Sequence, residues 1–123
     1  MARILVIDDD SLVRFALVLM LEHEGHEVME ADNGRKAMRI FRECQPDLVI
    51  ADIIMPKMDG FETIRELRDN AAELKIIAIS GGAPIGTPDI LKIAREFGAD
   101  AAFAKPIDRQ EFLSSVSRLL AAA

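Results

Sequence analysis

The stretch RILVIDDD at residues 3–10 decides the fold, because a strand-like run ends there in three consecutive aspartates. Residues 4–7 are all apolar, and short apolar runs are typical of strands that are buried on both faces of a parallel sheet. Three neighbouring carboxylates repel one another and contribute little to a hydrophobic core. We therefore expect Asp8 and Asp9 to serve a site at the point where this strand leaves the sheet.

Short apolar runs of this kind alternate along the chain with longer amphipathic stretches. The pattern predicts strands at 3–7, 27–31, 47–51, 75–79 and 101–104, and helices at 10–24, 33–44, 59–70, 87–97 and 108–121. Strict alternation of strands and helices predicts a parallel sheet with helices on both faces. The second and fifth runs are the least apolar and are expected at the edges. The whole chain, 1–123, is interpreted as one doubly wound α/β domain.

Capping residues support these boundaries. Asp10 is a natural N-cap for the first predicted helix, and Asp108 for the last, with Glu111 three residues on as in a capping box. Gly25 and Gly98 follow the first and fourth predicted helices, where a left-handed residue commonly ends a helix.

Composition limits the class of protein. A chain of 123 residues buries enough surface to fold without a disulfide, and Cys44, as the one cysteine, cannot form an internal one. A reducing, cytoplasmic location is the simplest expectation. The net charge of −6 argues against a nucleic-acid or anionic-membrane surface. No apolar run approaches the ~18 residues that a membrane span requires.

The carboxyl ends of the predicted strands carry residues of complementary chemistry. The first strand ends in Asp8–Asp10, the third in Asp52, the fourth in Ser80 and the fifth in Lys105. Ligands of open α/β sheets bind beyond these ends. Clustered carboxylates need a cation, and an oxygen-rich site with few protein ligands suits Mg²⁺. A hydroxyl and an ammonium beside a metal suit a phosphoryl group. Each residue alone has an ordinary explanation as a cap, a turn or a surface charge; the joint pattern indicates a site.

These motifs resemble the receiver domain of two-component response regulators, over all 123 residues. The similarity is carried by the segments ILVIDDD (4–10), LVIADIIMPKMDG (48–60), IIAISG (76–81) and GADAAFAKP (98–106). The resemblance implies a flavodoxin-like, CheY-like fold of five strands in the order 2-1-3-4-5 with five helices. It also implies a phosphoprotein that signals by conformational change to a downstream protein or by forming a self-dimer.

The resemblance further implies roles for single residues. Asp52 is the expected phosphoacceptor, taking a phosphoryl group from a histidine kinase or a histidine phosphotransfer protein in a Mg²⁺-dependent reaction. Asp9 is expected to bind Mg²⁺ directly and Asp8 directly or through a water. Asp52 itself and the backbone carbonyl of Ile54 would complete the protein ligands. The protein would not be an enzyme in the usual sense, although it would catalyse its own phosphorylation and dephosphorylation.

Further residues are expected to bind the phosphoryl group or to shape the site. By the same resemblance, Lys105 would pair with one phosphoryl oxygen and Ser80 would donate a hydrogen bond to another. Pro56 and Gly60 would shape the loop after the acceptor, and the peptide bond between Lys105 and Pro106 is a candidate for the cis form.

The chain departs from the family at the position of the switch residue, an aromatic side chain that rotates in most receivers when the hydroxyl group on the fourth strand moves. Most receivers have an aromatic residue three positions before the conserved lysine, and Ala102 stands there in this chain. The aromatic residue comes one position later, at Phe103, and a one-residue step in a strand reverses the face on which a side chain lies. We expect Phe103 to pack in the core, and movement of Ser80 and of the loop 80–89 to carry the signal.

The first predicted helix is apolar almost all round. The residues expected to face the sheet are Val13, Ala16, Leu17, Met20 and Leu21. Phe15, Val18 and Leu19 form a second stripe that is expected to face water, which predicts a docking surface for a partner or for a second copy. The alternative is that part of this stripe is buried.

Rival functions remain open. A Mg²⁺-dependent aspartyl-phosphate hydrolase of the haloacid dehalogenase type needs an acid two residues after its nucleophile, where this chain has Ile54. A flavodoxin-type flavin carrier needs a phosphate loop after the first strand, where the three aspartates would repel the phosphate. A scaffold that is never phosphorylated is a third possibility. The chain is expected to be a single-domain regulator or the receiver of a longer one.

Overall fold

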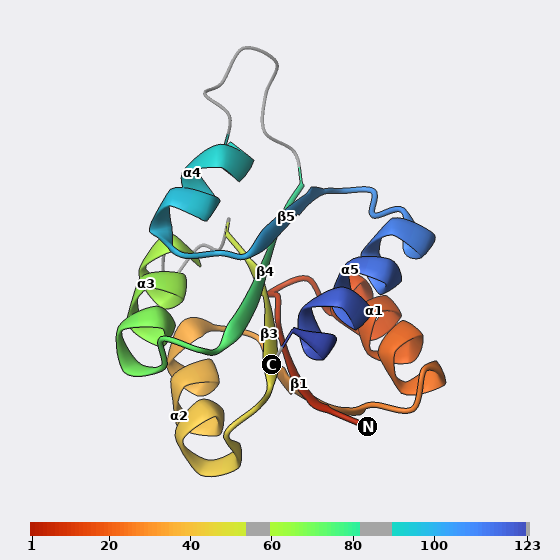
Figure 1. Ribbon diagram of the computed structural model, residues 1–123, viewed down its shortest axis with the longest axis horizontal. Coiled ribbons are helices and arrows are strands. Elements are labelled where there is room, and N and C mark those ends of the chain that lie inside the picture. Colours follow the sequence, from red (N-terminus) through yellow and green to blue (C-terminus); the bar gives the residue numbers. More distant parts are fainter. Residues whose placement is uncertain (54–59, 82–89, 123) are drawn as a thin grey trace.

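The computed structural model describes residues 1–53, 60–81 and 90–122, which form a parallel five-stranded sheet covered by helices (Figure 1). The strands are β1 (Arg3–Ile7), β2 (Glu27–Ala31), β3 (Leu48–Asp52), β4 (Lys75–Ser80) and β5 (Ala101–Ala104). Their order in the sheet is β2-β1-β3-β4-β5. The predicted fold, strand order and edge strands are therefore confirmed.

Five helices are described, and they cover both faces of the sheet. They are α1 (Ser11–His23), α2 (Gly34–Cys44), α3 (Gly60–Asn70), α4 (Ile90–Phe97) and α5 (Arg109–Ala121). Helices α1 and α5 lie on one face, and α2, α3 and α4 lie on the other (Figure 1). The doubly wound arrangement follows from this distribution. In the described part of the chain, no helix is long and apolar enough to cross a membrane.

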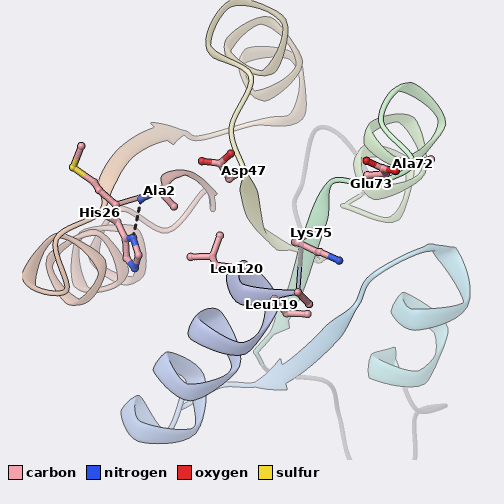
Figure 2. A pocket seen from close by; sticks show the side chains of 10 residues that line it. Ala2, His26, Asp47, Ala72, Glu73, Lys75, Leu119 and Leu120 are labelled. Atoms are coloured by element: carbon pink, nitrogen blue, oxygen red, sulfur yellow. Dashed lines mark hydrogen bonds between the residues drawn. The ribbon is translucent and has the colours of Figure 1, made fainter.

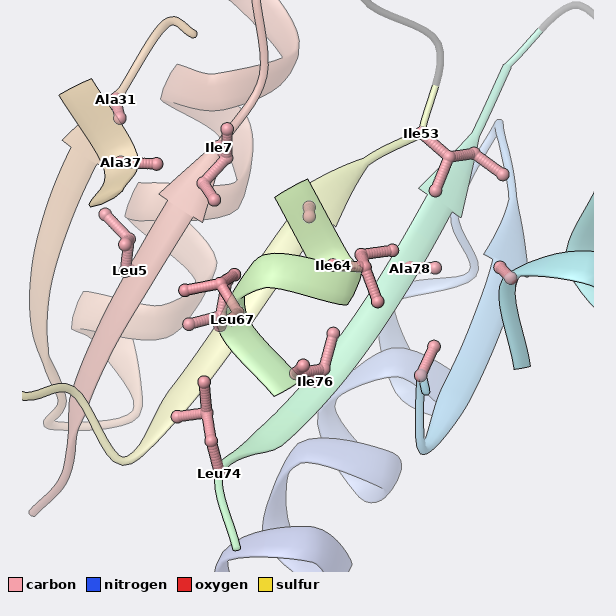
Figure 3. Close-up of a cluster of buried hydrophobic side chains, with 14 of the residues drawn as sticks. Leu5, Ile7, Ala31, Ala37, Ile53, Ile64, Leu67, Leu74, Ile76 and Ala78 are labelled. Atoms are coloured by element: carbon pink, nitrogen blue, oxygen red, sulfur yellow. The ribbon is translucent and has the colours of Figure 1, made fainter. Parts of the chain in front are cut away.

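The core consists of two clusters, one on each face of the sheet. Along β1, Leu5 and Ile7 point toward α2 and α3, whereas Ile4 and Val6 point toward α1 and α5; all four are fully buried. Figure 3 shows the first cluster, in which Ile64 and Leu67 of α3 pack onto the strands. Central strands buried on both faces explain why their sequences are continuous apolar runs.

Most predicted boundaries agree with the structure to within a residue or two. Asp10 caps α1 by accepting hydrogen bonds from the N–H groups of Leu12 and Val13, and Asp108 caps α5 by accepting from Glu111. Gly25 and Gly98 have φ values of 89° and 123°, as expected of residues that end helices. The start predicted for the fourth helix, at 87–89, lies outside the described residues.

The prediction for the outward stripe of α1 is partly wrong. Phe15 and Leu19 are 60% and 50% exposed, but Val18 is only 9% exposed. Val18 belongs to the same cluster as Phe112 and Val116 of α5, so α1 packs against α5 as well as against the sheet, and its buried arc is shifted. Ala16, predicted to face the sheet, is exposed for the same reason.

The exposed stripe of α1 is therefore made of different residues. Leu12, which is 79% exposed, joins Phe15 and Leu19. Spacings of three, four and seven residues place the three side chains along one side of the helix. We refer to Leu12, Phe15 and Leu19 as the α1 stripe.

Candidate functional site

The carboxyl edge of the sheet brings together the polar residues that the sequence singles out. Ile7 of β1 pairs with Ala51 of β3, so the residues that come next, Asp8 and Asp52, lie side by side at this edge. Asp52 and Ser80 are the last residues of β3 and β4. Lys105 comes directly after β5, and its N–H group donates to the carbonyl oxygen of Ser80 at 2.7 Å.

Lys105 connects the two buried carboxylates. Its Nζ atom lies 3.0 Å from Oδ2 of Asp8 and 3.1 Å from Oδ2 of Asp52. Asp8 is fully buried and Asp52 is 4% exposed. A single ammonium group therefore offsets part of the charge of two carboxylates that are largely shielded from water. The peptide bond between Lys105 and Pro106 is cis, as predicted.

The environment of these groups shifts their protonation. Burial is the largest effect on Asp8 and raises its pKa, although hydrogen bonds from Asp10 and Lys105 oppose the rise. The negative charge of Asp52 adds to the rise. Burial alone would lower the pKa of Lys105, but the hydrogen bonds and charges of Asp8 and Asp52 outweigh it and raise that pKa. The ammonium form of Lys105 is thus favoured, and the ionised form of Asp8 is disfavoured.

Three carboxylates at this edge can bind one cation. One oxygen each of Asp8, Asp9 and Asp52 lies within 4.8 Å of the other two. Asp9 is exposed, so solvent reaches the cluster from its side. Mg²⁺ prefers a few carboxylate oxygens and completes its octahedron with water, and this donor set fits that preference. Ile54, whose carbonyl is a predicted ligand, lies outside the described residues, as does Pro56.

Ser80 carries a buried hydroxyl group that has no hydrogen-bond partner among the described residues. It is 6% exposed, and its Oγ atom forms no hydrogen bond with the described part of the chain. A buried polar atom without a partner costs free energy, so it points to a role that folding alone does not supply. Such a hydroxyl can donate to an oxygen of a bound group.

Two glycines allow the backbone to approach the site closely. A Cβ atom on Gly60 would collide with the backbone of Ile53 and with the carbonyl oxygen of Asp52. A Cβ atom on Gly81 would lie 2.6 Å from Cδ of Lys105. Gly60 thus lets α3 start against the end of β3, and Gly81 leaves room for the lysine side chain to reach the carboxylates.

Arg14 is a contact of the site that sequence reasoning missed. Its Nη1 atom donates to the backbone carbonyl of Asp8 at 2.7 Å, and its Nε atom donates to Oε1 of Glu30 at 3.0 Å. The signal in the sequence is faint: Arg14 is the one charged residue between Ser11 and Leu21 in an otherwise apolar helix.

The switch residues lie on opposite faces of β5. Ala102 packs against the cluster formed with α2, α3 and α4, and Phe103 packs against the cluster formed with α1 and α5. Phe103 is half-buried, and its ring meets that of Phe112 edge to face, with centroids 5.9 Å apart. An aromatic ring is thus absent from the position of Ala102 on its face of β5. Residues 82–89 of the predicted mobile loop lie outside the described residues.

A separate pocket of about 880 Å³ opens at the other end of the sheet (Figure 2). Its lining includes His26, Asp47 and Lys75, which stand at the amino ends of strands, and Leu119 and Leu120 of α5. Nδ1 of His26 accepts a hydrogen bond from the N–H group of Ala2 at 3.3 Å. The described lining of this pocket does not include Asp8, Asp9, Asp52, Ser80 or Lys105.

The fold and the acidic edge together define a class of signalling domain. The chain matches the family model of the response regulator receiver domain over residues 4–117, and it belongs to that family of two-component signalling proteins.

Individual relatives agree with this assignment. The chain is 35% identical over 121 residues to protein PilH of Pseudomonas aeruginosa, covering 98% of this chain and 99% of PilH. It is 34% identical over 120 residues to the chemotaxis protein CheY of Halobacterium salinarum, covering 98% of each. A response regulator receiver domain protein from Clostridium thermocellum has a similar structure, with a TM-score of 0.89, 31% identity and coverage of 99% of this chain and 96% of that one. Other relatives are longer, and the chain spans 17% of one and 50% of another.

Proposed function

We propose that the chain is a phosphoacceptor that takes a phosphoryl group onto Asp52 from a phosphohistidine of a histidine kinase or of a histidine phosphotransfer protein. The observation that carries the proposal is the contact of one ammonium group, that of Lys105, with both Asp8 and Asp52, beside a cluster of three carboxylates. The reaction needs a carboxylate nucleophile whose repulsion from an incoming phosphoryl group is offset by nearby cations.

Each residue has a defined part in the transfer. A carboxylate oxygen of Asp52 attacks phosphorus, the P–N bond of the phosphohistidine breaks, and its electron pair stays on the imidazole nitrogen. Lys105, which contacts both carboxylates, pairs with a phosphoryl oxygen as negative charge arrives. Ser80, whose hydroxyl group has no partner in the described part of the chain, donates it to another phosphoryl oxygen.

A magnesium ion is the proposed cofactor of this reaction. Asp8, Asp9 and Asp52 would hold it, with the carbonyl of Ile54 as a further ligand. When bound, Mg²⁺ supplies positive charge that lowers the repulsion between the acceptor and the phosphoryl oxygens. The same ion would offset the repulsion among these aspartates, which gives a reason for the presence of Asp8 and Asp9 at the end of β1.

The output of the domain would be a change of conformation that a downstream protein or a second copy recognises. Because Ala102 offers no aromatic ring on its face of β5, movement of Ser80 rather than of a ring would transmit the change. A water molecule attacking the phosphoryl-aspartate would end the signal, so the domain would catalyse both its own phosphorylation and its own dephosphorylation.

The decisive experiment is the intact mass of the protein after incubation with acetyl phosphate, with and without Mg²⁺. We expect the wild type to gain one phosphoryl group only with Mg²⁺, and Asp52→Asn to gain none. The matched control is Asp69→Asn on the exposed side of α3, which should behave as the wild type. A gain that survives in Asp52→Asn would show that another residue is the acceptor, and no gain in the wild type would favour a scaffold that is never phosphorylated. Steady turnover of acetyl phosphate would favour a hydrolase.

We further propose that the α1 stripe is the surface on which the phosphodonor docks. The helix that carries Phe15 and Leu19 begins at Ser11, two residues after Asp9, so a partner lying on it can reach the acidic edge. Phe15→Asp should slow transfer from a phosphorylated histidine phosphotransfer protein and leave phosphorylation by acetyl phosphate unchanged. If Phe15→Asp alters neither transfer nor oligomeric state, the proposal is wrong.

A further inference from the structure

Arg14 lies where three elements meet at the edge of the proposed metal site. It belongs to the first turns of α1, its Nη1 atom donates to the carbonyl of Asp8, and its Nε atom pairs with Glu30 of β2. Its side chain is 19% exposed, so the guanidinium group is largely enclosed. The planar guanidinium group of Arg14 uses two different nitrogen atoms, fixed relative to each other, for its two acceptors, whereas a lysine has a single nitrogen atom.

The bond to the Asp8 carbonyl matters because this carbonyl is part of the peptide plane that joins Asp8 to Asp9. The orientation of that plane influences the direction in which the side chain of Asp9 projects from the backbone. The N–H group of Asp8 donates to the carbonyl of Ala31 at 3.1 Å, which fixes the other side of Asp8 to β2. Arg14 thus completes the anchoring of this short segment.

The two aspartates differ in how their side chains are held. One oxygen of Asp8 accepts from the N–H group of Asp10 and the other accepts from Lys105. Among residues 1–53, 60–81 and 90–122, the carboxylate of Asp9 takes part in no hydrogen bond or ion pair, and its side chain is exposed. The position of Asp9 therefore depends on its backbone: Arg14 holds the peptide that precedes Asp9, and the N–H group of Asp10 holds the peptide that follows it.

We propose that Arg14, braced by Glu30, is a positioning residue for the metal site: it fixes the peptide between Asp8 and Asp9 and thereby holds the Asp9 carboxylate in place for a divalent cation. This inference rests on the proposed function, which requires Mg²⁺ at these aspartates. Outer-shell partners of metal ligands commonly have this role, since they orient the ligands without touching the ion.

The sign of the effect separates positioning from electrostatics. Arg14 is a cation near a cation site, so removing its charge would by electrostatics alone make Mg²⁺ bind more tightly. Loss of positioning has the opposite effect and weakens binding. Arg14→Lys keeps the charge but has one nitrogen atom, which cannot occupy the positions of both Nε and Nη1, so positioning predicts weaker binding there as well.

The test is the Mg²⁺ dissociation constant measured by titration calorimetry on the wild type, Arg14→Gln and Arg14→Lys. We expect Arg14→Gln to weaken binding about tenfold, the lower end of the effect of outer-shell substitutions. Glu30→Gln, which keeps an oxygen acceptor for Nε, should retain most of the affinity. The charge control is Arg39→Gln on α2: Arg39 is exposed, takes part in no hydrogen bond or ion pair with the described residues, and its loss changes the net charge equally.

A second measurement does not depend on metal or on activity. In the metal-free protein, ¹⁵N relaxation should show a more mobile Asp9 amide in Arg14→Gln than in the wild type, and this also shows whether the variant is folded. Equal or tighter Mg²⁺ binding by Arg14→Gln, or wild-type affinity in Arg14→Lys, would overturn the inference. Absence of Mg²⁺ binding by the wild type would instead refute the proposed metal site, and the role of Arg14 with it.

Discussion

Lys105 and Asp8 are 97 residues apart in the sequence, yet Nζ of Lys105 lies 3.0 Å from Oδ2 of Asp8. The same ammonium group lies 3.1 Å from Asp52, so it is shared by two buried carboxylates. This arrangement connects the stability of the metal-free protein to the residues that would perform the chemistry. Substitutions of Lys105 and Asp8 test the effect of this contact on stability, and a substitution of Gly81 tests its effect on phosphorylation.

Replacing Lys105 by methionine should destabilise the metal-free protein. The change leaves Asp8 and Asp52 without their shared cation, and a charge-assisted hydrogen bond of this kind contributes on the order of 2 kcal/mol. Urea unfolding followed by circular dichroism in the presence of a chelator measures the loss. Millimolar Mg²⁺ should recover more stability in Lys105→Met than in the wild type, because the ion offsets the same repulsion.

The control for that experiment is Lys36→Met. Lys36 pairs with Asp32 at 3.2 Å, but both side chains are about half exposed, at 51% and 47%. An exposed pair contributes little, so the free energy of unfolding should change much less in Lys36→Met than in Lys105→Met. Equal losses in the two variants would show that Lys105 has no special part in stabilising the acidic edge.

Replacing Asp8 by asparagine should stabilise the metal-free protein at neutral pH. Burial raises the pKa of Asp8 above its ordinary value of 3.8, so the ionised side chain is less favourable in the folded than in the unfolded protein. Between 3.8 and the raised pKa the folded protein binds more protons than the unfolded chain. The free energy of unfolding contributed by Asp8 therefore falls as the pH rises through this window and stays low above it.

Unfolding experiments at a series of pH values test this sign. The advantage of Asp8→Asn over the wild type should be present at neutral pH and should disappear as the pH falls through the window, where Asp8 becomes neutral by itself. The same variant should lose most of its stabilisation by Mg²⁺. If Asp8→Asn were less stable than the wild type at neutral pH, the ion pair with Lys105 would outweigh the cost of burial.

The sequence predicted the parts of this fold that depend on local pattern and on the order of elements. Alternating apolar runs and amphipathic segments were sufficient for the five strands and their edges, and for the convergence of Asp8, Asp52 and Lys105 at one edge. Caps such as Asp10 are also local, because the side chain bonds to the backbone two and three residues away. In a parallel sheet, the carboxyl ends of strands that are distant in the sequence then lie at the same edge, so no further sequence signal is needed to predict this convergence.

The features that the sequence could not predict depend on packing between elements. Val18 is buried because α5 lies beside α1, and the periodicity of α1 alone carries no sign of that neighbour. Arg14 meets Glu30 only through the position of α1 over the edge strand, so the pair is invisible before the tertiary structure is known. That the Ser80 hydroxyl is buried without a partner among the described residues is likewise a property of its surroundings and not of its place in a motif.

Replacing Ser80 by alanine should leave stability nearly unchanged. The Oγ atom is buried without a hydrogen-bond partner in the described part of the chain, so its removal is expected to change the free energy of unfolding by no more than about 1 kcal/mol, in the stabilising direction if at all. The function should suffer instead: the gain in thermal stability on phosphorylation by acetyl phosphate should be smaller in Ser80→Ala than in the wild type.

Ser115 provides a matched comparison. It is also buried, at 3% exposed, but its Oγ atom accepts a hydrogen bond from Arg118 at 3.3 Å. Ser115→Ala should therefore cost about 1 kcal/mol, the usual contribution of one hydrogen bond. Its response to phosphorylation should be that of the wild type. The reverse pattern, with Ser80→Ala the more destabilised of the two, would mean that the Ser80 hydroxyl already has a structural role.

Replacing Gly81 by alanine should impair the site while preserving the fold. The new Cβ atom would lie 2.6 Å from Cδ of Lys105, and the flexible lysine can turn away only by giving up its reach to Asp8 and Asp52. Loss of one well-placed donor to a developing charge commonly lowers a rate a hundredfold or more, so a displaced lysine should slow phosphorylation by acetyl phosphate at least about tenfold.

Gly25→Ala is the control: Gly25 has a φ of 89° and no other atom within 4 Å of a Cβ, so that substitution strains the backbone far from the site. It should lower the free energy of unfolding by about 1 kcal/mol and leave the rate unchanged. A rate for Gly81→Ala equal to that for Gly25→Ala would show that the position of Lys105 does not limit phosphorylation.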